Sequence, residues 1–408
     1  MTPKDLLNTD VTEMPLVRIH GIFHREGGQY PFPFGEAHVS HWYNARVAIW
    51  QGIHALGLRA GDRVLVPAYA CGAEIDVLLS AGLTVDYYRA NADLSADLGD
   101  IARLCQQPTQ AVYIIHYFGV PQPMDALLAF VHKRRILLIE DNAHGLYSTD
   151  PAGSPLGSFG DMSVFSLHKT LAIPDGGLLL LRSASAHARV RDAGVPPDFL
   201  AVAGLAKFLL EERLKNYLPS TAKWVKGALT DPLIRYIKSH RGARVAIAEN
   251  ASPLAFQSGT CLWMMSQLTR RLLGGAVHGQ VGKIRRRNFN TLQALLKSSA
   301  ELKPMIEKLP AGACPWIFPV RTDEPEALAN HLHKRRIGHF RVWSFFHPEF
   351  PQTRFPYESA LKRSVVALPV HQDLGLDKIA RVADALNAWS GTDPRAIRDA
   401  DLRGIVAD

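Results

Sequence analysis

The chain has 408 residues, of which 47% are hydrophobic and 21% charged, with a formal net charge of +8 and a pI near 9.3. This composition is typical of a soluble globular enzyme that is long enough for a large core and a second domain. The sequence has no run of roughly eighteen apolar residues and its start is polar and acidic, which argues against a membrane span and a secretory signal. We therefore expect a cytoplasmic protein.

Two further classes are disfavoured by residue type. The basic excess is concentrated at 207–244 and 283–287, without an aromatic-interleaved RNA motif or a zinc finger, so a nucleic-acid partner is not predicted. The cysteines form no C-x-x-C pair, which predicts reduced thiols and no metal site. They are Cys71, Cys105, Cys261 and Cys314.

The chain begins with a segment that shows little periodicity, so we predict an irregular N-terminal arm over 1–40. Asn44 can cap a helix over Ala45–Leu56, whose apolar residues are spaced for one buried face. A strand at 64–66 follows and leads into a loop at 67–73.

Helices and strands then alternate as far as residue 181. The expected elements are a helix over 74–79, strands at 85–88 and 111–116, a helix over 124–132, and strands at 136–139 and 178–181. This alternation predicts a doubly wound, mostly parallel sheet. The apolar strand 136–139 leads into Glu140-Asp141, at the carboxyl end where open α/β sheets bind their ligands.

The stretch 157–177 places Lys169 among apolar residues, with no acidic residue within five positions. An ammonium group in such surroundings loses hydration, which favours the free amine that a Schiff-base lysine needs. Ser166 could hold a phosphate while the lysine reaches an aldehyde. An S-x-x-K pattern is unspecific by itself, but Asp141 upstream could keep a pyridinium nitrogen protonated. Together these residues predict a pyridoxal phosphate site.

The second half of the chain is less regular. Residues 186–250 are basic with amphipathic helical spacing, and two interpretations remain open: a helical lid or dimer element, which we favour, and a helix lying on a membrane surface. A long helix is expected over 257–273. The last domain is expected at 276–395, followed by a loose tail at 396–408.

Within this last domain the pattern predicts strands at 316–321 and 365–368 and a helix over 325–336. A basic helix that opens near Lys283 should lead into it. Arg341 and Trp343 lie on a loop or strand expected to point towards the cleft, where they could contact the substrate.

Several motifs are spread along the chain in a fixed order. They are Val64-Leu65-Val66-Pro67-Ala68-Tyr69; His116-Tyr117-Phe118-Gly119 with Pro121, Met124 and Asp125; Glu140-Asp141-Asn142-Ala143-His144; Gly160-Asp161 with Phe165-Ser166; and Leu368-Pro369-Val370-His371. In this joint pattern the chain resembles the DegT/DnrJ/EryC1/StrS aminotransferase family.

The resemblance implies a fold type I pyridoxal phosphate enzyme, with a large cofactor-binding α/β domain at 41–275 and the smaller α/β domain behind it. Lys169 would bind the cofactor covalently and move a proton, Asp141 would contact the ring nitrogen, and His144 would contact the 3-oxygen or ring face. Ser166 would contribute to phosphate binding.

The chain also departs from the family pattern. The phosphate-binding helix start is Asn44-Ala45-Arg46 rather than a Ser-Gly pair, although backbone amides there can still bind phosphate. Cys71 stands where an aromatic residue commonly stacks on the cofactor, so either Tyr69 or His116 takes over the stacking or the ring is covered less tightly. The serine precedes the lysine by three residues rather than five, while Lys169 keeps its usual seven-residue distance from Gly176-Gly177.

By resemblance, the expected reaction is transfer of an amino group from glutamate to a nucleotide-linked keto-sugar or a related cyclitol. The expected partners are these small molecules and a second copy of the chain, in a homodimer with a shared active site. Two alternatives remain open. The first is another pyridoxal-dependent reaction, either C–C bond formation or sugar dehydration, which relatives with histidine in place of the lysine perform. The second is a non-enzymatic regulator that binds the cofactor or associates with a membrane. His168 lies beside the lysine, so dehydration has to be considered.

Overall fold

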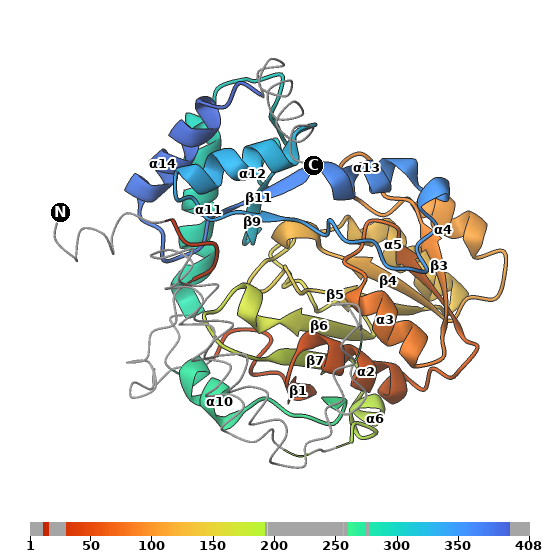
Figure 1. Ribbon diagram of the computed structural model, residues 1–408. Helices are drawn as coiled ribbons and strands as arrows, with labels where there is room; N and C mark the ends of the chain where they lie inside the picture. The colour runs from red at the N-terminus through yellow and green to blue at the C-terminus, as the bar shows by residue number, and fades with distance from the viewer. Residues whose placement is uncertain are drawn as a thin grey trace, which may run out of the picture.

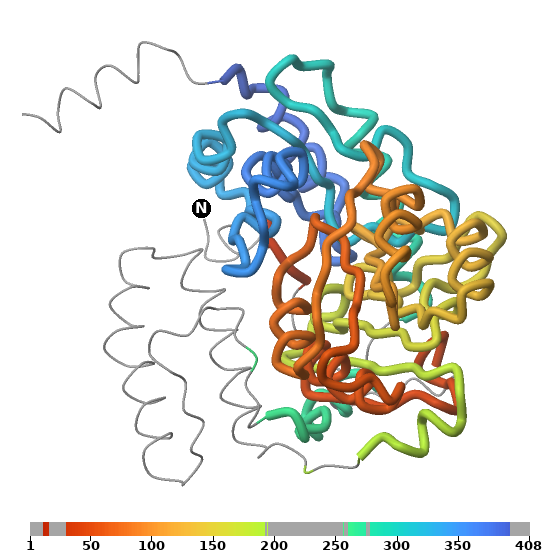
Figure 2. The backbone as a smooth tube through the Cα atoms, turned by 90° about the vertical axis from the view of Figure 1, so that its right-hand side faces the viewer, coloured from red at the N-terminus to blue at the C-terminus, as the bar shows by residue number. Residues whose placement is uncertain are grey.

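The computed structural model describes residues 11–15, 30–191, 194, 256, 260–274 and 278–391. Within these residues the chain forms two β-sheets, one of seven strands and one of four. Figure 1 places the four-stranded sheet and its helices, coloured from teal to blue, at one end of the larger sheet, and the tube in Figure 2 shows the same parts of the chain at the top. The predicted arm 1–40, the basic segment 186–250 and the tail 396–408 lie largely or wholly outside the described residues.

The seven-stranded sheet has a parallel centre. Its strands are β1 (Val39–Trp42), β2 (Arg63–Pro67), β3 (Thr84–Tyr88), β4 (Ala111–Ile115), β5 (Leu137–Asp141), β6 (Met162–Ser166) and β7 (Gly177–Leu181), in the order β1-β7-β6-β5-β4-β2-β3. The strands from β3 to β6 are parallel, whereas β7 is antiparallel to both β6 and β1. The predicted, mostly parallel α/β sheet is confirmed, and β1 is an edge strand that the sequence pattern did not indicate.

Helices connect these strands (Figure 1). They are α2 (Ala45–Leu56), α3 (Ala73–Ser80), α4 (Leu98–Leu104), α5 (Met124–Arg134), α6 (Ala184–His187) and, beyond the sheet, α10 (Gln267–Gly274). Helix α2 has the predicted bounds because the Asn44 side chain accepts a hydrogen bond from the backbone N–H of Val47 at 3.0 Å. The helix expected over 257–273 is wrong in extent: residues 261–266 are not helical, and Ser266 Oγ caps α10 by accepting the Thr269 N–H.

The second sheet is antiparallel and forms the smaller α/β unit. Its strands are β8 (Lys303–Pro304), β9 (Ile317–Arg321), β10 (Phe340–Arg341) and β11 (Val365–Pro369), in the order β10-β11-β9-β8. The accompanying helices are α11 (His278–Leu295), α12 (Pro325–Lys334), α13 (Pro356–Ser364) and α14 (Leu376–Asn387). The basic helix predicted near Lys283 therefore begins earlier, at His278. Among the described residues, no helix is both long and apolar enough to cross a bilayer.

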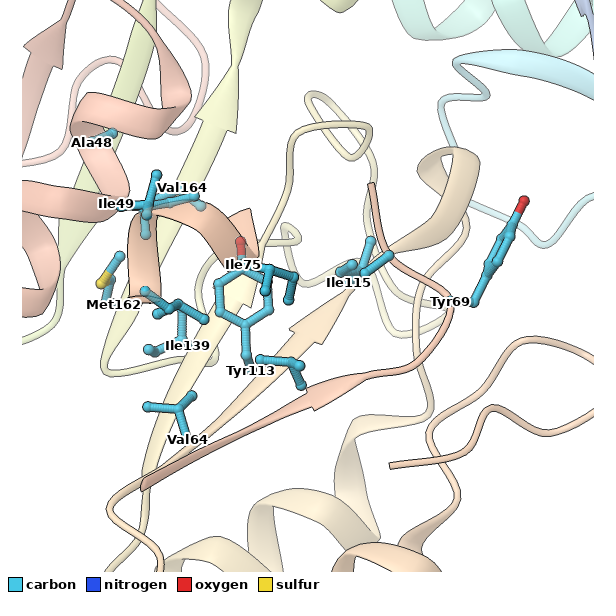
Figure 3. Packing of buried hydrophobic residues seen from close by; sticks show 14 of the residues in the cluster. Ala48, Ile49, Val64, Tyr69, Ile75, Tyr113, Ile115, Ile139, Met162 and Val164 are labelled. Atoms are coloured by element: carbon cyan, nitrogen blue, oxygen red, sulfur yellow. The ribbon is translucent and has the colours of Figure 1, made fainter. Parts of the chain in front are cut away.

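One hydrophobic cluster joins the two sheets. Tyr113, Ile139 and Val164 pack at the centre of the large sheet (Figure 3), and the same cluster continues through Trp316 and Phe350 of the smaller unit. Burial of apolar side chains is the main source of folding free energy, so this shared cluster holds the two units together. The edge where they meet is also the carboxyl edge of β4, β5 and β6.

Candidate active site

The predicted lysine and aspartate lie on neighbouring strands at the same edge of the large sheet. Asp141 is the last residue of β5 and pairs with Val164 of β6, while Lys169 ends a short 3-10 turn, η3 (Leu167–Lys169), directly after β6. Residues 162–167 are buried, yet His168 is exposed and Lys169 only half-buried. The amine therefore lies in the interior of the fold but remains open to an incoming ligand.

Lys169 is held by His144. Its Nζ lies 3.0 Å from Nε2 of His144, whose Nδ1 accepts a hydrogen bond of 3.2 Å from the backbone N–H of Phe118. Because Nδ1 accepts, we assign the ring proton to Nε2, so that Nε2–H donates to the lysine amine. Burial, and then the charge of Lys169, lower the pKa of His144 well below its usual value, which favours this neutral tautomer. The arrangement points the Nε2–H of His144 at the lysine nitrogen.

Aromatic rings from the smaller unit cover this pair. The Trp316 ring stacks on His144 with centroids 4.0 Å apart, and its centroid lies 5.0 Å from Lys169 Nζ. Trp343 stacks on the same histidine at 5.4 Å. Sequence analysis placed Trp343 near the cleft but missed Trp316, for which no local motif exists. These rings limit the access of water to one side of the amine.

Asp141 is buried and fixed at both oxygens. Oδ2 accepts a hydrogen bond of 2.6 Å from the hydroxyl of Tyr113, and Oδ1 accepts one of 2.7 Å from the backbone N–H of Ala143. Burial, with the charges of Asp141 and then Glu74, raises the pKa of Tyr113 well above its usual value, so its hydroxyl remains a donor. Sequence analysis did not single out Tyr113 or Glu74 as site residues. A carboxylate so oriented can bind a cationic ring nitrogen.

The loop after β2 completes this side of the site. Cys71 is half-buried, and its backbone N–H donates to Glu74 Oε1 at 2.8 Å. Burial, followed by the charge of Glu74, raises the pKa of the Cys71 thiol, while the charge of Lys169 acts in the opposite direction. The positive charge of Lys169 therefore acts on the Cys71 thiol, which places the two side chains in the same part of the site.

The start of α2 lies next to the end of β6. Ser166 pairs with Gly177, and a Cβ on Gly177 would lie 2.3 Å from the carbonyl carbon of Asn44 and 2.5 Å from the Ala45 nitrogen. A residue without a side chain is therefore required for the backbone of β7 to approach the helix start this closely. No acidic residue lies in the first turn of α2, so its positive end is available to an anion.

His168 and Arg46 add positive or polar groups to the same place. Ser166 Oγ lies 3.3 Å from Nδ1 of His168. Desolvation, with smaller effects of Lys169 and Arg46, lowers the pKa of His168 to about 4, although its side chain remains accessible to water. The predicted residues Asn44, Ala45, Arg46, Ser166 and Lys169 therefore surround one small region.

Comparison with known proteins identifies this arrangement. Residues 32–215 match the family described as the DegT/DnrJ/EryC1/StrS aminotransferase family. This region of the chain belongs to that family. Over 149 residues it is 28% identical to a GDP-perosamine synthase of Escherichia coli O157:H7, covering 36% of this chain and 41% of that protein. Over 134 residues it is 31% identical to dTDP-4-dehydro-2,3,6-trideoxy-D-glucose 4-aminotransferase of Saccharopolyspora spinosa, covering 32% and 34%.

The matched regions thus span about two-fifths or less of these curated DegT-family relatives. The similarity in fold extends further. Helicobacter pylori PseC, an aminotransferase involved in the biosynthesis of pseudoaminic acid, superposes with a TM-score of 0.63 at 15% identity, covering 93% of this chain and 98% of that one. The fold type I prediction is confirmed.

The structure does not bring every DegT-like candidate to Lys169. Both ring nitrogens of His116 are occupied, Nε2 by Glu140 Oε1 at 3.0 Å and Nδ1 by the backbone N–H of Gln122 at 3.0 Å, and the side chain is fully buried. His116 therefore cannot contact a substrate or stack on a cofactor beside the lysine without breaking this pairing.

Tyr69 and Arg341 also face elsewhere. The Tyr69 ring packs on Trp343 at 4.9 Å and on Tyr117 at 5.5 Å, so it supports the aromatic wall from behind. Arg341 binds the carboxylate of Glu326 and the carbonyl of Arg363 at the outer edge of the second sheet. Neither alternative for replacing the missing aromatic residue, Tyr69 or His116, is placed to do so, and the rings nearest the amine are His144 and Trp316.

Proposed function

We propose that this chain is a pyridoxal phosphate-dependent aminotransferase. It would transfer an amino group from glutamate to a nucleotide-linked keto-sugar or to a related cyclitol. The observation that carries the proposal is the half-buried Lys169 amine, which contacts Nε2 of His144 at 3.0 Å and remains open to a ligand. The names of the curated relatives, a GDP-perosamine synthase and a dTDP-sugar 4-aminotransferase, support the sugar substrate.

The residues present fit the cofactor. The close approach of Gly177 to Asn44 leaves the backbone N–H groups at the start of α2 beside Ser166, with Arg46 and His168 nearby to bind a phosphate. Asp141, held by Tyr113, would bind the ring nitrogen, and Cys71 would lie against the ring. When bound, pyridoxal phosphate supplies an aldehyde for the lysine and a ring that withdraws electrons from the reacting carbon.

Each residue of the chain then has a definite task. The free Lys169 amine would accept the proton from the α-carbon of the donor. The same amine would then give this proton up again to complete the amino transfer. His144 orients this amine through Nε2–H, because Phe118 fixes its tautomer. Asp141 would bind the ring nitrogen through a carboxylate that Tyr113 and the Ala143 N–H orient, and Trp316 keeps water away from the amine.

The sugar-dehydrating alternative, in which histidine replaces the lysine, has less support. Lys169 makes the contact with His144, whereas the neighbouring His168 contacts Ser166 at the phosphate end. We also propose a homodimer that shares its active site, as the resemblance implies, and light scattering after size exclusion would test it. The segment 186–250, for which we favour a role at that dimer contact, lies largely outside the described residues.

A labelling experiment tests the proposal. The purified protein is mixed with pyridoxal phosphate, reduced with borohydride, digested and analysed by mass spectrometry. We expect a phosphopyridoxyl group on Lys169 and none on Lys334, an exposed lysine of α12. Added glutamate, before reduction, should yield stoichiometric 2-oxoglutarate and pyridoxamine phosphate. Labelling elsewhere, or no 2-oxoglutarate, would contradict the aminotransferase.

A further inference from the structure

A buried lysine lies behind the loop that joins β2 to α3, residues 68–72, which we call the Cys71 loop. Lys362 of α13 is 2% exposed, and its Nζ donates a hydrogen bond to the carbonyl of Ala70. Glu74, on the first turn of α3, is 5% exposed and accepts the N–H of Cys71 at 2.8 Å. The two side chains therefore bind the C=O and the N–H of a single peptide group, the one that joins Ala70 to Cys71, and each comes from a different structural unit.

The pair is also matched in charge. An isolated buried carboxylate or ammonium group is costly, and each is tolerated when the other compensates it. Burial lowers the pKa of Lys362 to about 8, while the charges of Glu74 and Cys71 act against this shift. Burial, and then the charge of Asp141, raise the pKa of Glu74, and Lys362 acts against that shift in turn. Each group thus favours the charged form of the other.

The space around Lys362 offers little other compensation. A cavity of about 10 Å³ adjoins it, lined by Ala70, Gly72, Tyr87 and His347 among others, which is room for roughly one water molecule. The hydroxyl of Tyr87 has no hydrogen-bond partner among the described residues. Glu358 on the preceding turn of α13 is committed to the backbone N–H of Ala90 at 3.0 Å.

We propose that Lys362 and Glu74 are positioning residues that hold the Cys71 loop against Lys169. Lys362 is the counter-charge that allows an ionised Glu74 to bind the Cys71 N–H, and it attaches the loop to the smaller unit through Ala70. The loop therefore covers the amine only while residue 74 supplies an acceptor for the Cys71 N–H, and a carboxylate there needs Lys362 as its counter-charge. The inference rests on the proposed function in one respect, that the ligand covered by the loop is pyridoxal phosphate.

Thiol reactivity tests this without any cofactor. Cys71 and Cys261 are both half-buried free thiols, and the Cys261 carbonyl is bound by Gln51 of α2, so Cys261 serves as the internal control. We would measure iodoacetamide labelling of each cysteine by peptide mass spectrometry. Loss of a hydrogen bond to a charged group is worth about 1.5–3 kcal/mol, so Lys362→Met should raise the Cys71-to-Cys261 labelling ratio by about tenfold or more.

The decisive variant is the double one. Glu74→Gln keeps an oxygen for the Cys71 N–H and needs no counter-charge, so Lys362→Met with Glu74→Gln should return the ratio to within about twofold of wild type. A ratio unchanged in Lys362→Met, or no rescue in the double variant, would overturn the proposal. If Lys362→Met does not fold, Glu74→Ala against Glu74→Gln decides, because only the alanine should raise the ratio.

A measurement of cofactor affinity distinguishes failure of the loop proposal from failure of the proposed function. The affinity of wild type and variants for pyridoxal phosphate is measured by absorbance titration, and we expect Lys362→Met to weaken it by about tenfold, with rescue by Glu74→Gln. If the labelling ratio responds as expected but no variant binds the cofactor, the loop attachment stands and the proposed function fails. If the cofactor binds equally well to all variants and the ratio does not change, the loop attachment fails alone.

Discussion

Two histidine pairs lie one strand apart in this molecule and have opposite characters. His116 and Glu140 are both fully buried, and Glu140 also accepts hydrogen bonds from Gly157, Phe159 and Gly160 of the loop before β6. His144 and Lys169 form an equally short contact, but the lysine remains accessible to solvent. The first pair closes a loop, and the second leaves a reactive atom available.

The difference follows from the alternation of side chains along β5. Glu140 and Asp141 are adjacent and therefore point to opposite faces of the sheet. Glu140 faces the loop that leads into β6, while Asp141 faces Tyr113 and the site. A histidine with both nitrogens satisfied by rigid protein groups adds stability, whereas one that leaves its partner open can take part in chemistry.

The largest effect is expected at Lys169, the solvent-accessible member of the pair with His144. Lys169→Ala should lower the rate of 2-oxoglutarate formation from glutamate by at least about 10³-fold, because the proton-transferring group is removed. The free energy of unfolding in urea should change by less than about 1 kcal/mol, since the side chain is half-buried. Lys334→Ala provides the control, and retention of a tenth of the activity would refute a catalytic role for Lys169.

The fully buried pair, His116 and Glu140, should affect the stability of the fold and not the binding of the cofactor. Glu140→Gln replaces two acceptor oxygens by one and leaves some of the loop N–H groups without a partner. We expect the free energy of unfolding to fall by on the order of 3 kcal/mol, with cofactor affinity of the folded protein preserved. Urea unfolding measures the first and absorbance titration the second. Glu307→Gln, at an exposed site, should change neither, and a stable Glu140→Gln protein would show that Glu140 is not structural.

The same carboxylate predicts a pH dependence. Burial raises the pKa of Glu140, but the hydrogen bonds from His116, Gly160 and Gly157 outweigh it, so the net pKa is lowered from 4.5. The folded state therefore binds this proton less tightly than the unfolded state, and the stabilisation is present above about pH 4.5 and lost as the pH falls further. Urea unfolding at several pH values should show a steeper acid loss in wild type than in Glu140→Gln. Parallel curves would contradict this assignment.

The smallest effect concerns the orienting ring. His144→Gln keeps an N–H donor for Lys169 but loses the stack on Trp316, so we expect the half-reaction rate to fall by about three- to tenfold. His144→Ala removes the donor as well and should cost about a hundredfold. Stopped-flow absorbance with glutamate separates the two. Equal rates in both variants would show that Nε2–H does not orient the amine.

Elements with local signals were predicted well from the sequence. The bounds of α2 follow from Asn44 as a cap and from the spacing of apolar residues, and both lie within one stretch of chain. The strands β5 and β7 appear as short apolar runs. β1 was missed because its place at the sheet edge depends on pairing with β7 far along the chain. The amphipathic spacing of Ile379, Val382 and Leu386 in α14 was a usable signal that we did not apply.

The site was predictable only where motifs carry it. Asp141, His144, Ser166 and Lys169 follow from the resemblance, and the structure places them at one edge of the sheet. Trp316 and Tyr113 could not be found in this way, because their roles arise from packing between distant segments. His116 was misjudged for the same reason: its partner Glu140 is visible in the sequence, but the direction in which a strand residue points is not.

The contact between Gly177 and Asn44 sets a limit on how this protein can change. Lys169 and Gly177 belong to the same connection between β6 and β7, and Gly177 fixes where α2 begins. One short segment of chain thus determines how far the amine stands from the anion-binding helix end. Lengthening or shortening the stretch from Lys169 to Gly177 by a single residue would shift the amine relative to that helix end, so natural variants should differ between these two residues by substitution and not by insertion or deletion.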